Sequence, residues 1–481
     1  MSKNSFLENK TNNYYLTILL LFFAFILRFF DFDSVGLWGD EILTYWETEP
    51  LQTYNEVWLK IKDTEYNSPL YFYILNIYNH FFEYSAYSIR LFHIIFGFLS
   101  LLLAFFISNY IFTKSFSNLV LFLLSINLFL IWISTEVRII SFALFFYLFL
   151  ILIFFHIIKN ISNKKLYFFE IISLCFFNLF ALSLHPFAII IVFSQLLFLF
   201  LIYLSKRELI KKKIFVYSFL IILFCFLYLF LNLDYILSRL DGKPMAHNKL
   251  SIEFFIGYNF KSFFNSYILG FINLLLIILS IWKLRKNVYE NLFILYLLII
   301  FVSTYVFIIF ISLTLSGITG ARYWTYLVPI ITIVNLFYIS NLKIKSLSNS
   351  LIIFLIFFSI FICAKDFNNP QIRKPDTPGL IKFINQSNVE NIVSENISYF
   401  DLYLRTGYRK YLNKKILYEK DIDNFKDDFL YVCLDLLWKP EISTYSKELY
   451  DCYPKSINTN KFKKSKTLKF YGYAVTKFEI K

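Results

Sequence analysis

Long apolar runs recur along this chain from Tyr15 to about Cys363, and they constrain the fold more than any other feature. Each run has roughly 17–22 residues, which as a helix is long enough to cross a hydrocarbon core of about 30 Å. Only 17% of the residues are charged, against about 25% in a typical soluble protein. The sequence therefore predicts an all-α polytopic membrane protein with about eleven transmembrane helices. The expected spans are 15–30, 88–109, 118–133, 139–158, 166–184, 187–204, 214–232, 263–282, 292–315, 324–340 and 348–363.

The net charge of +14 would suit a nucleic-acid partner, but the positions of the basic residues argue against one. The basic residues fall in segments that eleven spans would place on one side of the bilayer: Lys3, Lys10, Lys114, Lys159–Lys165, Lys206–Lys213, Lys283–Lys286 and Lys343–Lys345. By the positive-inside rule that side is cytoplasmic. We therefore expect a multi-pass protein of the plasma membrane (the inner membrane of a bacterium) with a cytoplasmic N-terminus and no nucleic-acid partner. The first span lacks a small-residue cleavage site, so we expect it to be retained.

The composition changes near residue 366, where Asn-Asn-Pro, Lys-Pro-Asp and Thr-Pro-Gly indicate a linker. We expect a transmembrane domain over 1–365, which includes a long first external loop at 31–87, and a soluble extracytoplasmic domain over 366–481. Short strand-like runs at Asn391–Val393, Phe429–Leu434 and Tyr473–Phe478 predict a small α/β fold for the second domain. Cys433 and Cys452 both lie in this second domain, where they form either a disulfide or two unpaired buried thiols.

An adjacent acidic pair, Asp40-Glu41, follows the first span by about ten residues. A carboxylate in a cleft at the membrane surface can take a proton from an acceptor hydroxyl, or help to hold a divalent cation. The alternative is an ordinary pair of loop acids. Trp38, Tyr45 and Trp46 flank the pair, and such rings can wall a sugar site or anchor at the interface. We therefore assign catalytic roles to Asp40 and Glu41.

Glu65 is a further acid of the first external loop, just before Pro69, which opens an expected interfacial helix over Pro69–Phe82. It could orient a substrate or share a metal ion with Asp40 and Glu41. It is equally well explained as a solvated loop acid.

Charged side chains at the edges of packed spans usually have partners or ligands, because their desolvation is costly. Glu136 and Arg138 lie in a short turn between two apolar runs, and the planar guanidinium of Arg138 suits a phosphate group. A Glu136–Arg138 pair and an Arg138–lipid pair are the alternatives.

A second arginine follows two glycines, which let the backbone approach a ligand closely. This arginine, Arg322, is followed by Tyr323 and is a second candidate phosphate ligand or a headgroup anchor. His185 follows the end of a span on the expected outer side. It is either a substrate-binding group or an interfacial residue.

Several common site signatures are missing from the sequence. It has no Walker A loop, no Rossmann glycine pattern and no Cys/His zinc spacing. A water-soluble nucleotide-activated donor is therefore not expected, and the substrate should arrive through the lipid phase. No cofactor is assigned, apart from a divalent cation at Asp40, Glu41 and Glu65 if the chemistry uses one.

Six short strings together resemble the GT-C membrane glycosyltransferases, in the branch with protein O-mannosyltransferases, lipid A aminoarabinose transferases and lipopolysaccharide-core galacturonosyltransferases. These strings are Leu37–Glu41, Asn67–Phe72, Ile89–Leu91, Glu136–Arg138, Leu184–Pro186 and Arg322-Tyr323. They spread over residues 30–330 and keep the order found in the family. The chain has Ser68-Pro69 where the family often has Pro-Pro, and the C-terminal domain matches in placement only.

The resemblance implies a GT-C-like fold and a sugar donor linked to polyprenyl phosphate. Transfer would occur on the outer face, by a single displacement with inversion, to an envelope glycolipid, a polysaccharide or a protein hydroxyl. Asp40 would act as the general base or orient the acceptor, with Glu41 and Glu65 supporting it or holding a metal. Arg138 and Arg322 would neutralise the lipid phosphate.

Three other functions are compatible with a polytopic chain: a transporter or lipid-linked sugar flippase, a sugar polymerase or ligase, and an inactive scaffold. A transporter would be expected to carry ionisable or Gly/Pro-broken positions at mid-membrane, often in repeated halves. In this sequence the charges cluster at the expected outer ends of spans, which favours chemistry at the surface.

Overall fold

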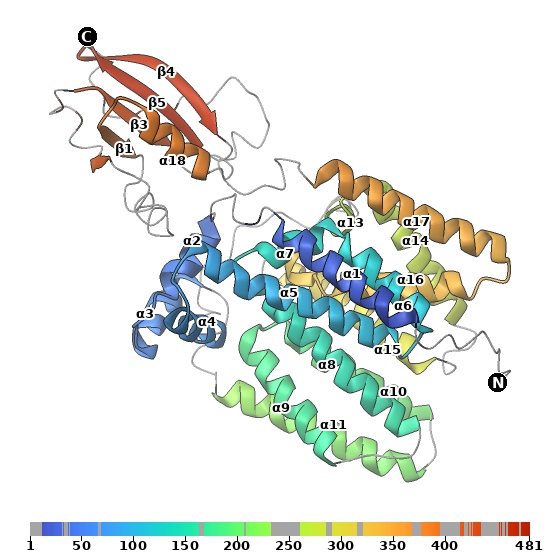
Figure 1. The fold of residues 1–481 in the computed structure, drawn as a ribbon. Coiled ribbons are helices and arrows are strands. Elements are labelled where there is room, and N and C mark those ends of the chain that lie inside the picture. Colours follow the sequence, from blue (N-terminus) through green and yellow to red (C-terminus); the bar gives the residue numbers. More distant parts are fainter. Residues whose placement is uncertain are drawn as a thin grey trace. The chain divides into compact units, whose positions relative to one another are not determined.

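Helices make up most of the described chain in the computed structural model (Figure 1). The structure describes residues 12–30, 32, 37, 39–65, 69–162, 168–205, 208–231, 260–284, 291–314, 321–367, 377–394, 414–417, 422, 425, 427–433, 452, 454, 457, 460–470 and 473–481. The chain divides into two compact units. Unit 1 contains residues 1–30, 62–71 and 93–367, and unit 2 contains residues 31–61, 72–92 and 368–481. The expected domain boundary between residues 365 and 366 stays a prediction.

Unit 1 is a bundle of apolar helices. Its elements are α1 (Asn12–Phe29), most of α5 (Ala86–Ser108), α6 (Lys114–Ser125), α7 (Leu128–Thr135), α8 (Ile139–Ser162), α9 (Phe168–Leu184), α10 (Ala188–Ser205), α11 (Glu208–Leu231), α13 (Lys261–Phe264), α14 (Tyr267–Leu284), α15 (Leu292–Thr314), η2 (Ala321–Trp324), α16 (Leu327–Ser340) and α17 (Lys345–Asp366). Packed pairs include α1 with α6, α8 with α9, α10 with α15 and α14 with α16. Large apolar side chains such as Phe226 and Phe357 are 65% and 70% exposed, as expected for faces that contact lipid.

Four described helices are long and apolar enough to cross a membrane: Ala86–Ser108, Ile139–Asn160, Leu292–Phe310 and Lys345–Asp366. A bent pair of helices, α6 and α7, raises that number to five if it counts as one span. Six other helices contain a shorter apolar segment of 10–17 described residues. At 1.5 Å per residue the 14 residues of α16 reach about 21 Å, short of a 30 Å core. Within the described ranges the structure therefore supports a helical membrane protein with four or five apolar spans, and the expected number of eleven is not confirmed.

The expected span over 118–133 is broken by a bend of 63° between α6 and α7. Asn127 lies at the bend and caps α7, since its side chain accepts a hydrogen bond from the backbone N–H of Leu130. Its Nδ2 donates to the backbone oxygen of Phe263 at 2.8 Å. An amide that satisfies backbone groups on both sides stabilises a break in an otherwise apolar stretch.

Unit 2 begins with α2 (Gly39–Glu47) and holds most of α3 (Tyr54–Thr64) and α4 (Pro69–Phe81), together with the first turns of α5. Thr53 and Glu56 start α3 with a reciprocal cap: the Glu56 carboxylate accepts from the Thr53 N–H at 2.7 Å, and Thr53 Oγ1 accepts from the Glu56 N–H at 3.3 Å. Pro69 is the first residue of α4, where its fixed φ suits a helix. The helix expected over Pro69–Phe82 is therefore present.

The C-terminal residues of unit 2 form a five-stranded sheet in the order β2-β1-β3-β5-β4. Its elements are α18 (Thr377–Gln386), β1 (Asn391–Ser394), β2 (Lys415–Leu417), β3 (Phe429–Cys433), β4 (Phe462–Phe470) and β5 (Tyr473–Ile480). β1 pairs in parallel with β2 and β3, whereas β5 is antiparallel to β3 and β4. The strand-like runs that begin at Asn391, Phe429 and Tyr473 are thus confirmed as β1, β3 and β5.

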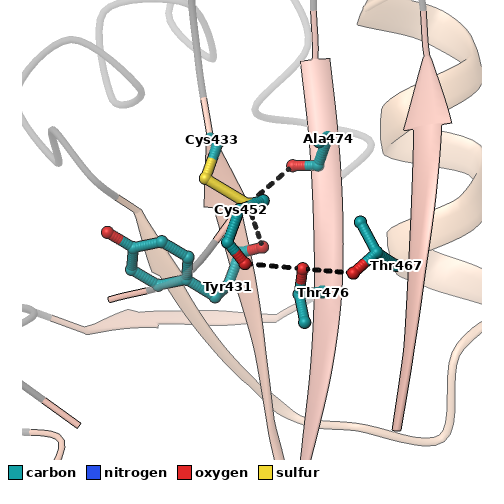
Figure 2. The surroundings of a disulfide bond; sticks show 6 residues. All are labelled: Tyr431, Cys433, Cys452, Thr467, Ala474 and Thr476. Atoms are coloured by element: carbon teal, nitrogen blue, oxygen red, sulfur yellow. Dashed lines mark hydrogen bonds between the residues drawn. A yellow bond between two sulfur atoms is a disulfide. The ribbon is translucent and has the colours of Figure 1, made fainter. Parts of the chain in front are cut away.

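A disulfide joins Cys433, at the end of β3, to Cys452 (Figure 2). Of the two alternatives that the sequence left open for these cysteines, the structure has the disulfide. Thr476 of β5 donates a hydrogen bond to the backbone oxygen of Cys452 at 2.7 Å, and its hydroxyl lies 2.9 Å from that of Thr467 on β4. The disulfide and this hydrogen bond therefore anchor Cys452 against the core of the sheet.

Candidate active site

The acidic pair lies at the first turn of α2, in unit 2. Glu41 is fully buried, and its carboxylate lies 3.8 Å from the guanidinium of Arg90, which is also fully buried. Arg90 also donates to the backbone oxygen of Phe32 at 2.8 Å. Asp40 is half-buried, so it is the more accessible of the two acids. This arrangement suits Glu41 for holding α2 in place and leaves Asp40 as the carboxylate that a substrate can reach.

Two tyrosines fix the other end of α2. Tyr45 and Tyr84 stack with their ring centroids 4.0 Å apart. Each hydroxyl donates to the backbone oxygen of the other residue, at 3.1 Å from Tyr45 and 2.7 Å from Tyr84. Asn79 of α4 adds a hydrogen bond to the backbone oxygen of Thr48 at 2.8 Å. The helix that carries Asp40 is therefore held within unit 2 by polar contacts as well as by packing.

The two candidate phosphate-binding arginines lie in unit 1, and each is paired with a glutamate from another segment. Arg138 donates to both oxygens of Glu65, at 2.5 and 3.0 Å. Arg322 Nη1 lies 3.1 Å from Glu136 Oε1. The Glu136 carboxylate is thus joined to an arginine 186 residues away along the chain. All four side chains are at most one-fifth exposed, so both pairs are sheltered from water.

A pocket in unit 1 brings Arg322, Tyr323 and His185 together. Its other lining residues are Ile140, Ala143, Leu144, Tyr147, Thr325 and Tyr326. The Arg322 guanidinium lies 5.4 Å from the centroid of the Tyr323 ring, and that ring stacks near His185 at 6.0 Å. One cationic group, an imidazole and several hydroxyls thus share apolar walls, and each of these polar groups can donate a hydrogen bond to an anionic oxygen.

His185 is neutral in this environment. Its Nδ1 accepts a hydrogen bond from the backbone N–H of Phe187 at 3.3 Å and lies 2.9 Å from the hydroxyl of Tyr147. An Nδ1 that accepts from a backbone N–H assigns the ring proton to Nε2. Burial, with a smaller contribution from the charge of Arg138, lowers the pKa of His185 to about 3. His185 therefore offers an uncharged N–H donor rather than a second cation.

The lowered pKa of His185 predicts a pH-dependent stability. The unfolded chain binds the proton with a pKa near 6.5 and the folded one only near 3, so the folded state loses stability as pH falls through this window. At pH 4.5 the loss from this residue should be about 2–3 kcal/mol. Unfolding of the detergent-solubilised protein at pH 7 and pH 4.5 measures it. His185→Gln should show a smaller drop between these pH values than the wild type, and an equal drop in both proteins would contradict the assignment.

Two residues outside the sequence-based candidates position the turn that carries Glu136 and Arg138. Arg28, fully buried near the end of α1, donates from Nε to Ser134 Oγ at 3.1 Å. A Cβ added at Gly97 would lie 2.2 Å from the same Ser134 Oγ, so only glycine fits there. The sequence does mark Arg28 as unusual, because it is an arginine in the last turn of an apolar helix. Its contact with Ser134 could not be predicted, because that contact depends on the packing of distant helices.

The residues expected to bind a metal ion all belong to the described part of the chain. Within it, no group of three or more His, Cys, Asp or Glu side chains is arranged to hold a metal ion. Glu41 and Glu65 each pair with a guanidinium, so a metal ion would have to compete with an arginine for each carboxylate. A divalent cation at Asp40, Glu41 and Glu65 stays an untested prediction.

Comparisons with known proteins identify the fold. No protein-family model and no curated protein sequence matches the chain. ArnT from Cupriavidus metallidurans in the apo state is similar in structure, with a TM-score of 0.54, 10% identity, and coverage of 96% of this chain and 97% of that one. ArnT bound to undecaprenyl phosphate gives a TM-score of 0.51 at 10% identity, with the same coverage. The match to the oligosaccharyltransferase of Archaeoglobus fulgidus in the apo form covers 85% of this chain and 61% of the oligosaccharyltransferase, with 12% identity and a TM-score of 0.49. The chain therefore has a GT-C-like fold, as the sequence strings predicted.

Proposed function

We propose that this protein is an integral-membrane glycosyltransferase that moves a sugar from polyprenyl phosphate to an envelope acceptor on the external face. The observation that carries the proposal is the pocket of unit 1, where Arg322 meets the neutral His185 beside Tyr323. The ArnT structure of the same fold was solved with undecaprenyl phosphate, which is the same class of ligand. The phosphate of the donor would lie at Arg322, with Arg138 as the second cation and the Nε2–H of His185 as a neutral donor.

In this proposal the chemistry is a single displacement at the anomeric carbon. Asp40 takes the proton of an acceptor hydroxyl as the oxygen attacks, and the bond between the anomeric carbon and the phosphate oxygen breaks. The leaving group is polyprenyl phosphate, so the arginines stabilise the charge that it gains and no strong general acid is required. The attack comes from the face opposite the phosphate, and the anomeric configuration is therefore inverted.

The remaining acids take supporting roles. Glu41, buried against Arg90, positions the helix that carries Asp40. Glu65 and Glu136 hold the two arginines before the donor arrives. The acceptor is a hydroxyl of an envelope glycolipid, a polysaccharide or a protein, and the C-terminal domain lies on the extracytoplasmic side.

The experiment that tests this function compares the envelope of cells with and without the gene. Mass spectrometry of extracted glycolipids, polysaccharides and glycoproteins should show one class of molecule that lacks a single sugar in the deletion strain. The corresponding polyprenyl-phosphate sugar should accumulate, because its consumer is missing. An envelope with the same sugars in both strains and no accumulated donor would contradict the proposal, whereas accumulation on the cytoplasmic leaflet alone would indicate a flippase.

A further inference from the structure

The two arginines proposed to bind the lipid phosphate already hold carboxylates in the structure. Arg138 donates through both terminal nitrogens to Glu65, and Arg322 lies 3.1 Å from Glu136. Glu65 is 3% exposed and Glu136 is fully buried, so neither carboxylate has water as a ready alternative partner. A phosphate that approaches these guanidinium groups must therefore compete with two anions that belong to the protein.

We propose that Glu65 and Glu136 are internal competitors for the lipid phosphate, and that their return to the arginines speeds the release of polyprenyl phosphate after transfer. This inference rests on the proposed function and adds a role for two residues that would otherwise be read as substrate ligands. Neither glutamate contacts the sugar in this account. Each acts through the arginine that it pairs with.

The charges of the donor and the product explain why such a competitor is useful. A sugar phosphodiester carries one negative charge, whereas the phosphate monoester left after transfer carries about 1.5–2 at pH 7. Arginines without competitors would therefore bind the product more tightly than the donor, and product release would limit turnover. A carboxylate that pairs with each arginine only in the free enzyme lowers the affinity for the phosphate, because the ligand must then displace a stabilising contact.

The burial of the glutamates sets the size of this effect. When phosphate occupies Arg322, the fully buried carboxylate of Glu136 loses a cationic partner, and a buried charge separated from its partner is strongly unfavourable. That cost falls on the liganded state alone. Both donor and product bind less tightly as a result. The effect matters most for the more highly charged product, because its slow dissociation would otherwise limit turnover.

Glu136→Gln tests the inference, since it removes the competing charge and keeps the size of the side chain. We expect the Kd of the full-length purified protein for polyprenyl phosphate to fall about tenfold, which equals 1.4 kcal/mol. Steady-state turnover at saturating donor should fall, because polyprenyl phosphate then dissociates more slowly. Glu170→Gln is the matched control, because Glu170 pairs with His156 and Asn160 in another part of unit 1. We expect the same Kd in this control as in the wild type.

Equal or weaker binding of polyprenyl phosphate by Glu136→Gln would overturn the inference. The variant also loses a counter-ion of Arg322 and should be less stable, so the rise in Tm at saturating polyprenyl phosphate is measured as a second readout. A larger rise than in the wild type supports the inference, and an equal or smaller rise contradicts it.

Arg322→Ala separates the two claims. If its Kd equals that of the wild type, the phosphate does not bind at Arg322, and the proposed site fails together with the inference. If Arg322→Ala weakens binding while Glu136→Gln does not strengthen it, the phosphate site stands and only the competition is wrong.

Discussion

Replacing Asp40 with Asn is expected to lower the turnover of sugar transfer by about three orders of magnitude, as the loss of a general base typically does. The amide keeps the size of the side chain but cannot accept the proton of the acceptor hydroxyl. Asp40 is half-buried at the start of α2, whereas Tyr45 stacks on Tyr84 near the other end of the helix. The measurement is the transfer of labelled sugar from a polyprenyl-phosphate donor by the reconstituted protein.

The control for Asp40→Asn is Glu83→Gln, which removes an exposed carboxylate from the same unit. This variant should keep wild-type turnover, and both variants should unfold at temperatures close to that of the wild type. Turnover by Asp40→Asn within a few-fold of the wild type would remove Asp40 from the mechanism. Loss of activity in both variants would point to a general effect of charge.

Replacing Arg138 with Ala should raise the donor KM by about 10- to 100-fold, because a charge-assisted hydrogen bond to phosphate is worth roughly 1.5–3 kcal/mol. The same change leaves the buried carboxylate of Glu65 without its bidentate partner, which should also destabilise the protein. The double variant Arg138→Ala, Glu65→Gln separates the two effects. It should recover most of the lost stability while the donor KM stays high.

Steady-state kinetics at several donor concentrations, together with thermal unfolding, measure both effects. A donor KM that returns to the wild-type value in the double variant would show that Arg138 matters only as the counter-ion of Glu65. A wild-type KM in the single variant would contradict the phosphate-binding role directly.

The apolar helices could be predicted from the sequence because hydropathy depends on local composition. The bend between α6 and α7 could not be predicted in this way, because it depends on one polar residue in an apolar stretch. Asn127 caps α7 and donates a hydrogen bond to Phe263, 136 residues away. The expected span over 324–340 starts too early, because Ala321–Trp324 form the 3-10 helix η2 and α16 begins only at Leu327.

The candidate site was predictable as a set of residues but not as a set of partners. Arg138 and Arg322 were identified from their positions at the edges of apolar runs. Their pairing with Glu65 and Glu136 joins segments 73 and 186 residues apart, which no local pattern encodes. Arg28 and Gly97 were missed because their contacts with Ser134 arise only when distant helices pack.

The central claim is that a lipid-borne sugar is transferred with polyprenyl phosphate as the leaving group. The most direct measurement incubates the wild-type protein in vesicles with a polyprenyl-phosphate sugar and an envelope acceptor, and quantifies both products. The account predicts one polyprenyl phosphate released for each sugar attached, with inverted anomeric configuration. Release of polyprenyl phosphate without an attached sugar, or retained configuration in the product, would contradict it.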